Sequence, residues 1–348
     1  MKYRRLYSVL AAWLAIGLAP GAAAIEGGAE PAAEKGGSDS GYAVLEETVP
    51  HERLFALAFD GDRGIAVGDL GMVMWTRDGG TTWTREKAPT DLALLGVTMV
   101  GDRVIAVGQR GLILVRDIDG SWREIESDTE ERLLNVDANA NGLAYAVGAF
   151  GTVLRSADGG ETWRAAAPDW SALDETAESE TDISGAAGEP TMNAVQVMAN
   201  GTVLLGGEIA YVLRSEDRGA NWSLAYRSQV PPGEIKPAVN GLRVRPDGVG
   251  FAVGQAGLLL KTTDGGRSWR RLTTPASGNL HAVVSASDGA VVVVGMRVAL
   301  RSHDEGATWE VLEGLDLALN WYSDVAAASG TGQPVAVGHS ARIIRIPK

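Results

Sequence analysis

The chain has 348 residues, no cysteine, 45 glycines and 10 tryptophans, with 44 acidic against 31 basic residues. A hydrophobic content of 45% is enough for a large core and excludes an intrinsically disordered chain. The net charge of −13 argues against a nucleic-acid-binding protein, and the absence of cysteine excludes disulfides, thiolate metal sites and a cysteine nucleophile.

The N-terminus has the features of an export signal. Three basic residues, Lys2, Arg4 and Arg5, precede an apolar stretch that ends at Leu18, and alanines up to Ala24 suit a signal peptidase. We expect a signal peptide over residues 1–24 that is cleaved near Ala24, and an exported, periplasmic protein; an uncleaved membrane anchor is the alternative. Residues 25–41 are rich in Gly, Ala, Glu, Pro and Ser and predict a flexible leader.

From residue 42 onward a tripeptide recurs along the chain. Ala-Val-Gly occurs five times, and looser copies end at Gly207 and Gly295. Seven motif glycines therefore stand at positions 68, 108, 148, 207, 254, 295 and 338. Successive motif glycines are 40 to 47 residues apart, except for 59 between the third and the fourth. A fixed period of this length indicates a repeat architecture.

A turn with a tryptophan follows most of these motifs. Its pattern is Ser/Thr-x-Asp-x-Gly-x-x-Trp, in which the Asp accepts hydrogen bonds from its own turn, a Gly takes a positive φ and the Trp is buried. The second unit keeps only Asp119-Gly-Ser-Trp122, so its turn has lost a residue. The five complete turns supply the structural pairs Asp78 and Trp83, Asp158 and Trp163, Asp217 and Trp222, Asp264 and Trp269, and Asp304 and Trp309.

Each unit has the pattern of four short strands. Four-stranded units of 40 to 45 residues predict an all-β fold, a seven-bladed β-propeller of antiparallel blades over residues 42–348. The last unit has only three strands, and the segment Tyr42–Val49 resembles the missing fourth strand. We therefore expect this N-terminal strand to pair with the last blade and close the ring; an open solenoid is the alternative.

Two departures from the repeat concern charge. Residues 168–190 form an acidic insert between the third and fourth units, for which a solvated loop or a site for a cation or a basic partner is open. A basic residue recurs on the third strand of nearly every unit, and it predicts either a ladder of contacts between blades or a set of cationic contacts for an acidic protein segment or anionic cofactor. These candidate binding residues are Arg116, Arg155, Arg214, Lys261, Arg301 and Arg345.

The turn pattern is the Asp-box, or bacterial neuraminidase repeat, and its pairing with Ala-Val-Gly resembles the photosystem II stability and assembly factor family. The resemblance covers essentially the whole mature chain. It implies a seven-bladed propeller on the periplasmic side, or in the thylakoid lumen of a photosynthetic host, that acts without catalysis in assembling a membrane protein complex. The implied partners are that complex or its periplasmic or lumenal segments, and we expect a monomer without cofactor or metal.

Enzyme chemistry finds little support in the residues. Sialidases resemble this chain in the Asp-box but carry Arg-Ile-Pro near their first blade, whereas here the tripeptide occurs only at Arg345-Ile-Pro347 in the last strand. The four histidines lack the spacing of a metal site, and no catalytic residue is proposed. Two alternatives stay open: an accessory protein of an envelope transporter, and a propeller that binds or hydrolyses glycosides.

Overall fold

A computed structural model describes residues 42–47, 51–173, 189–228, 236–286, 288–328, 330 and 332–347. The predicted signal peptide, the leader and most of the acidic insert, including Asp174, Glu175, Glu178, Glu180 and Asp182, lie outside the described residues. No helix in the described ranges is long and apolar enough to cross a membrane.

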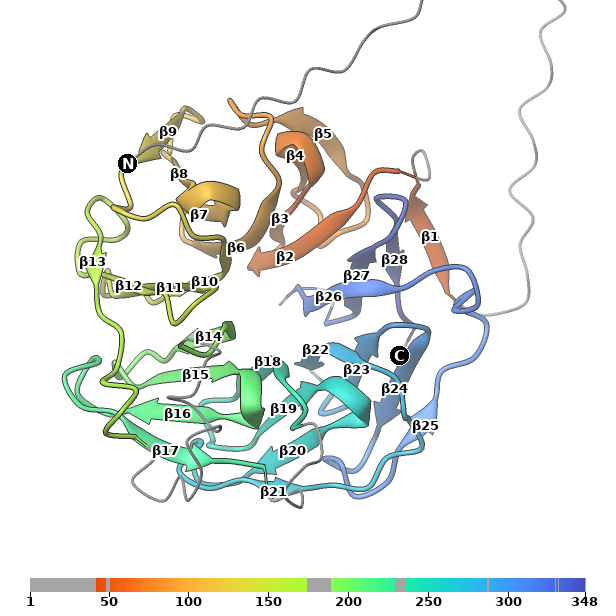
Figure 1. The fold of residues 1–348 in the computed structure, drawn as a ribbon. Coiled ribbons are helices and arrows are strands. Elements are labelled where there is room, and N and C mark those ends of the chain that lie inside the picture. The colour runs from red at the N-terminus through yellow and green to blue at the C-terminus, as the bar shows by residue number, and fades with distance from the viewer. Residues whose placement is uncertain are drawn as a thin grey trace, which may run out of the picture. The chain divides into compact units, whose positions relative to one another are not determined.

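The described strands form seven four-stranded antiparallel sheets, each a blade of the predicted propeller (Figure 1). The first three blades contain β2 (Leu54–Asp60), β3 (Arg63–Gly68), β4 (Met72–Thr76) and β5 (Thr84–Lys87); β6 (Leu94–Val100), β7 (Arg103–Gly108), β8 (Ile113–Arg116) and β9 (Trp122–Ile125); and β10 (Leu133–Ala138), β11 (Ala144–Gly148), β12 (Val153–Ser156) and β13 (Arg164–Ala165).

The next three blades contain β14 (Met192–Val197), β15 (Val203–Gly207), β16 (Val212–Ser215) and β17 (Ser223–Tyr226); β18 (Val239–Val244), β19 (Gly250–Gly254), β20 (Leu259–Thr262) and β21 (Arg270–Arg271); and β22 (Leu280–Ser285), β23 (Val291–Gly295), β24 (Val298–Ser302) and β25 (Glu310–Val311). The seventh blade contains β26 (Tyr322–Ala327), β27 (Pro334–Gly338), β28 (Ile343–Arg345) and β1 (Ala43–Glu46).

The ring closes as predicted. β1 pairs antiparallel with β28, with Ala43 opposite Arg345 and Val44 opposite Ile344. The first strand of each blade lies nearest the centre of the ring and contacts the first strand of the next blade, and β26 contacts β2 to complete the circle (Figure 1). The N-terminal strand thereby covers the edge that the last blade would otherwise expose.

The core lies between neighbouring blades. The second strands end in the Ala-Val-Gly motif and are buried along nearly their whole length. Seven apolar clusters fill the space between successive sheets. A Cβ on any of the seven motif glycines would lie less than 3.0 Å from a backbone carbonyl oxygen of the chain that enters the blade. The motif glycine is therefore required by close backbone packing, because an extended φ such as the −168° of Gly254 is open to any residue.

Because the strands alternate in direction, the loops divide between two faces. The turn face carries the loops between first and second strands and the Asp turns between third and fourth strands. The tip face carries the loops between second and third strands together with the connections from one blade to the next. Short 3-10 turns form four of the loops on the tip face: η1 (Asp69–Gly71), η2 (Gln109–Gly111), η3 (Glu208–Ala210) and η4 (Gln255–Gly257).

Candidate functional site

The recurring basic residues of the third strands join each blade to the next one. Nε of Arg214 donates to the carbonyl of Gly265 at 3.1 Å, and Nζ of Lys261 donates to the carbonyl of Glu305, each acceptor lying in the Asp turn of the following blade. Arg345 donates to Oγ1 of Thr81 at 2.8 Å, which extends the same pattern across the closure of the ring.

Arg301 follows the same rule, since it donates to the carbonyl of Pro347 in the last blade. Arg214 and Arg301 are only 7% and 6% exposed. The geometry is that of the ladder between blades, one of the two predicted roles, and it leaves these guanidinium groups little surface for a partner.

Two members of the set differ. Arg155 is partly buried and lies beside Tyr145, whose hydroxyl makes the contact with the next turn by donating to the carbonyl of Arg218 at 2.8 Å. Arg116 pairs with Val104, whereas the ring position of that blade is Val115, opposite Ile105. Arg116 is therefore one residue beyond the register of the ring.

Arg116 belongs instead to an aromatic contact between the first two blades. Its guanidinium carbon lies 4.4 Å from the ring centroid of Trp75 and 5.9 Å from that of Trp122. The indole N–H of Trp122 donates to Oε1 of Glu86 at 3.0 Å, and the same carboxylate lies 3.5 Å from Arg116. Trp75 occupies the ring position of the first blade, so an aromatic face there replaces the cation.

The Asp turns form closed hydrogen-bond units. In the third blade, Oδ1 of Asp158 accepts the N–H of Thr162 at 3.0 Å, and Oδ2 accepts the Thr162 hydroxyl at 2.6 Å. The Ser156 hydroxyl donates to Oδ1 at 2.6 Å, and this bond together with those from Thr162 stabilises the ionised carboxylate and lowers the pKa of Asp158 to about 2. The carboxylates of Asp78, Asp217, Asp264 and Asp304 accept equivalent bonds within their own turns and have pKa values of about 2 as well.

The tryptophan at the end of the turn adds a hydrogen bond in four of the described turns. The indole N–H groups of Trp83, Trp163, Trp269 and Trp309 each donate to the carbonyl of a turn glycine at 3.0 to 3.2 Å. Trp222 packs edge-on against Tyr145, with ring centroids 6.2 Å apart. These Asp carboxylates accept hydrogen bonds from the backbone of their own turns and so stabilise the turns.

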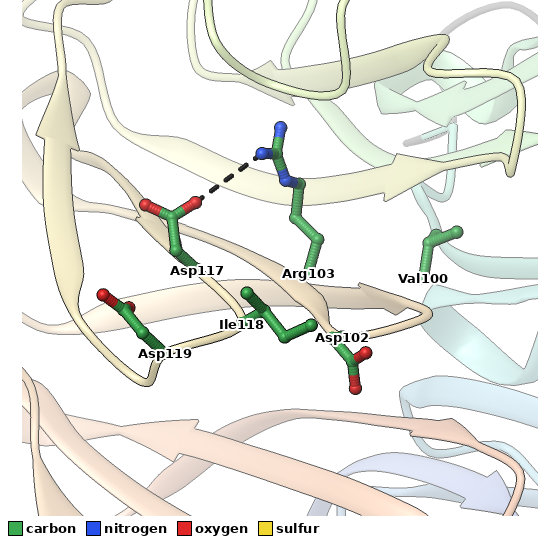
Figure 2. Close-up of a pocket in the computed structure, with 6 residues that line it drawn as sticks. All are labelled: Val100, Asp102, Arg103, Asp117, Ile118 and Asp119. Atoms are coloured by element: carbon green, nitrogen blue, oxygen red, sulfur yellow. Dashed lines mark ion pairs between the residues drawn. The ribbon is translucent and has the colours of Figure 1, made fainter.

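A pocket of about 460 Å³ opens on the turn face at the shortened turn of the second blade (Figure 2). Arg103 lies 3.6 Å from Asp117 and 2.8 Å from Glu161, and Arg123 lies 2.7 Å from Asp117. Ile118, which is 81% exposed, stands at its rim. Because each carboxylate of this network already has an arginine partner, the pocket offers weak affinity for a further cation.

Polar side chains of the inner strands bind the backbone of the next blade. Asn193, Asn240 and His281 occupy the second position of β14, β18 and β22, and each donates to the carbonyl of the first residue in the next inner strand, at 2.8 to 3.1 Å. Gln196 both donates to and accepts from the backbone of Val244 at 2.8 Å. These bonds occupy part of the free inner edge of the fifth, sixth and seventh sheets.

Two carboxylates of the inner strands, Asp137 and Asp324, accept hydrogen bonds from the backbone of the next blade. Asp137 accepts from the N–H of Val197 at 2.8 Å and from the Thr98 hydroxyl at 3.2 Å, and its Oδ2 lies 3.5 Å from Nη1 of Arg243. Asp324 accepts from the N–H of Leu57 at 2.8 Å, across the junction that closes the ring. Burial raises the pKa of Asp324 to about 6, and the hydrogen bond from the Leu57 N–H and the positive charge of Arg243 partly offset this effect.

The tip face repeats one backbone feature in every blade. The second residue after each motif glycine has a positive φ although it is not glycine, with values from 50° to 62°. Such conformations cost on the order of 1 kcal/mol each and cluster at functional sites. We call these residues the tips: Leu70, Arg110, Phe150, Ile209, Ala256, Arg297 and Ser340.

Backbone hydrogen bonds hold each tip loop in place. In the third blade, the N–H of Ala149 donates to the carbonyl of Arg132 at 3.0 Å, and the N–H of Gly151 donates to the carbonyl of Pro190 at 3.1 Å. The first acceptor enters the same blade and the second enters the next one. The residue before the tip makes the equivalent bond in all seven blades. The side chain of the tip is therefore presented on a fixed backbone.

Exposed apolar side chains gather on this face. Of six large apolar side chains that stand exposed in the described ranges, four lie on the tip face: Leu70, Phe150, Met296 and Leu319. The second residues of the first three inner strands are apolar and partly exposed as well, namely Phe55, Leu95 and Leu134. An exposed apolar surface on a rigid scaffold is typical of a protein-binding site.

Neither the tips nor the polar side chains of the inner strands were predicted from the sequence. A signal for the tips was present, since Gly-x-x-Gly follows the motif in four blades, and the variable residue before the second glycine is the tip. No sequence pattern marks the inner-strand carboxylates Asp137 and Asp324, because they stand in strands of ordinary composition. Within the described ranges, His, Asp and Glu side chains form no group of three that could hold a metal ion.

No protein-family model and no curated protein matches the chain. Among solved structures, the fold is similar to YCF48 bound to a D1 peptide, with 19% identity, a TM-score of 0.65 and coverage of 88% of this chain and 94% of that one. YCF48 from Cyanidioschyzon merolae gives 18% identity, a TM-score of 0.67 and coverage of 88% and 99%.

A catalytically inactive virginiamycin B lyase from Staphylococcus aureus, solved with quinupristin, matches with 11% identity, a TM-score of 0.69 and coverage of 87% and 98%. This fold therefore occurs both in a lyase and in a photosystem II assembly factor. The chain has the propeller fold of the YCF48 structures, as the resemblance to photosystem II assembly factors implied.

Proposed function

We propose that this protein is a non-enzymatic binding platform that holds a segment of another protein against its tip face. The observation that carries the proposal is the set of tips, which combines a strained but fixed backbone with exposed Leu70 and Phe150. A surface that is already ordered loses little conformational entropy on binding. The YCF48 structure with a D1 peptide supports the proposal, since that propeller binds a peptide.

The biological setting that we propose is the assembly of a membrane protein complex by an exported protein. The basic n-region, the apolar stretch and the alanines up to Ala24 support export. Mass measurement of the protein purified from its host tests this part. A mature chain that begins near residue 25 is expected, and a full-length chain that remains with the membrane would favour the uncleaved anchor.

A crosslinking pull-down tests the platform itself. The tagged mature protein is incubated with membranes of the source organism, and captured proteins are identified by mass spectrometry. We expect capture by the unsubstituted protein and by Ile118→Ser, which changes an exposed apolar residue on the turn face, but reduced capture by Phe150→Gly. Equal capture by all three would exclude the tip face.

The identity of the captured proteins decides the setting. Photosystem II reaction-centre subunits would support the assembly-factor role in a photosynthetic host, and a permease would favour the accessory protein of a transporter. The basic ladder is a poor choice for this experiment, because substituting Arg214 also removes a contact between blades. If no protein is captured specifically, the platform proposal fails.

A further inference from the structure

Phe150 stands on the tip face between two groups of carboxylates. On one side, the connection Glu126–Arg132 carries four acidic residues and one arginine, and Glu126, Asp128 and Glu130 are exposed. The carbonyls of Glu131 and Arg132 accept backbone N–H groups from the tip loops of the second and third blades. This acidic connection therefore lies between the tips Arg110 and Phe150.

On the other side of Phe150 lie Glu189 and Glu208. The carboxylate of Glu189 lies beside Gly151, the residue after the tip. Glu208 is exposed and accepts the N–H of Thr191 at 2.7 Å. Phe150, which is 63% exposed, thus projects from a surface of predominantly negative charge.

The carboxylates of this surface are available to a partner. Glu126, Asp128 and Glu130 form no ion pair with any described residue, in contrast to Asp117 and Glu161 on the turn face, which are paired with Arg103 and Arg123. Unpaired exposed carboxylates around an apolar side chain favour a partner that carries positive charge next to an apolar anchor.

A buried donor without a partner lies at the base of the same tip. Trp170 is 6% exposed, and its Nε1 has no hydrogen-bond partner in the described structure. That nitrogen lies 2.8 Å from the position that a Cβ on Gly151 would occupy. Because this nitrogen is covered from solvent, it belongs to the base of the tip and not to the surface that a bound segment contacts.

We infer that the surface around Phe150 binds an extended protein segment in which Lys or Arg residues flank an aromatic or branched aliphatic side chain. The apolar side chain of the segment packs against Phe150, and its cations lie over the carboxylates of residues 126–131, Glu189 and Glu208. The inference rests on the proposed binding function and specifies the chemistry of the partner. The sign of the charge is opposite to that expected from the basic third-strand residues.

The test is selection of peptides from a random displayed library of dodecamers on the immobilised mature protein. Selected sequences are expected to be rich in Lys and Arg beside an apolar residue. Affinities of the synthetic peptides are then measured by fluorescence anisotropy at low and high salt. Binding is expected to weaken as salt rises, because exposed charge pairs are screened.

Variants with matched controls locate the site. Phe150→Gly removes the side chain at a φ that glycine adopts without strain, so the fold is retained, and it is expected to weaken binding about tenfold or more. Ile118→Ser removes an exposed apolar side chain on the turn face and should leave affinity unchanged. Asp128→Lys should weaken binding severalfold, whereas Glu124→Lys, an equal charge change on β9, should not.

The outcomes separate this inference from the proposed function. If acidic or uncharged peptides are selected, or if Phe150→Gly and Asp128→Lys bind as well as their controls, the charge and the location assigned here are wrong while the platform can stand. If the pull-down captures a partner whose bound segment is acidic, the inference also fails alone. If neither the library nor the membranes yield a specific ligand, both fail.

Discussion

Replacing Asp324 by asparagine is expected to make the stability of the propeller less dependent on pH. The Asp324 carboxylate accepts the N–H of Leu57 at 2.8 Å, where the last blade meets the first, and its Oδ1 accepts the N–H of Val325 at 2.8 Å. Asparagine keeps one acceptor oxygen for Leu57 but cannot ionise. The substitution therefore removes the charge and retains most of the shape.

The magnitude follows from the pKa of this carboxyl. Burial raises the pKa of Asp324 from 3.8 to about 6, so the folded protein binds the proton more tightly than the unfolded chain does. The associated stabilisation is fully present below the unfolded pKa and is lost as pH rises through about 6. At about 1.4 kcal/mol for each pKa unit, the full effect is about 3 kcal/mol, of which about 2 kcal/mol is lost between pH 4.5 and 7.5.

Urea unfolding of both proteins at these two pH values measures the effect. The other carboxyl groups are shared, so their contributions cancel in the comparison. We expect the asparagine variant to gain about 2 kcal/mol of unfolding free energy relative to the parent protein when the pH is raised from about 4.5 to about 7.5. An equal difference at both pH values, or a change of opposite sign, would refute the reasoning. Asp324→Ala should lose the same pH dependence but be less stable throughout, because the N–H of Leu57 then lacks its acceptor.

Four further substitutions are checked by the same unfolding assay. Gly148→Ala should destabilise the protein by about 2 kcal/mol or more, because its Cβ collides with the backbone carbonyl of Arg132, whereas Phe150→Gly, two residues on, should stay within about 1 kcal/mol of the parent or be more stable. Arg214→Gln should cost about 2 kcal/mol, since the carbonyl of Gly265 loses its donor; an unchanged melting temperature would contradict the ladder. Asp158→Ala should cost about 1 kcal/mol at neutral pH, and this cost should shrink as pH falls from about 4 through about 2, because the lowered pKa of Asp158 gives stability that only the ionised carboxylate provides.

The blade count and the closure of the ring could be predicted because both depend on local patterns. The hydrogen bonds of an Asp turn all lie within seven residues of the chain. The strand before the first unit pairs with the last unit, which has only three strands of its own. The first strands of the first three blades begin at Leu54, Leu94 and Leu133, each in an apolar run that precedes its Ala-Val-Gly motif. Each of these features is specified by its own segment and requires no knowledge of the neighbouring blade.

The contacts of the basic residues could not be predicted in the same way, because register and loop length act together. Arg116 stands eight residues after its motif glycine and Arg301 stands six residues after its own, whereas the other four basic residues stand seven residues after theirs. In the sixth blade the tip loop is shorter, with Gly295 paired directly with Val298, so Arg301 returns to the ring register opposite Val292. In the second blade no such shortening precedes Arg116, which falls out of the ring and meets Trp75 instead.

The distribution of these contacts argues for a division of labour between the two faces. On the turn face, the charged side chains of the ladder and of the Arg103 network are occupied by neighbouring blades and stabilise the ring. On the tip face, a main-chain hydrogen bond from the residue before the tip holds the strained backbone in all seven blades, and the side chains at Leu70 and Phe150 are left in solvent. Glycine at these two tips would relieve the strain, and a polar residue would lower the exposed apolar area. A tip that has neither is best explained by a partner that covers it, which is why Phe150 is the position at which binding and stability are expected to respond in opposite directions.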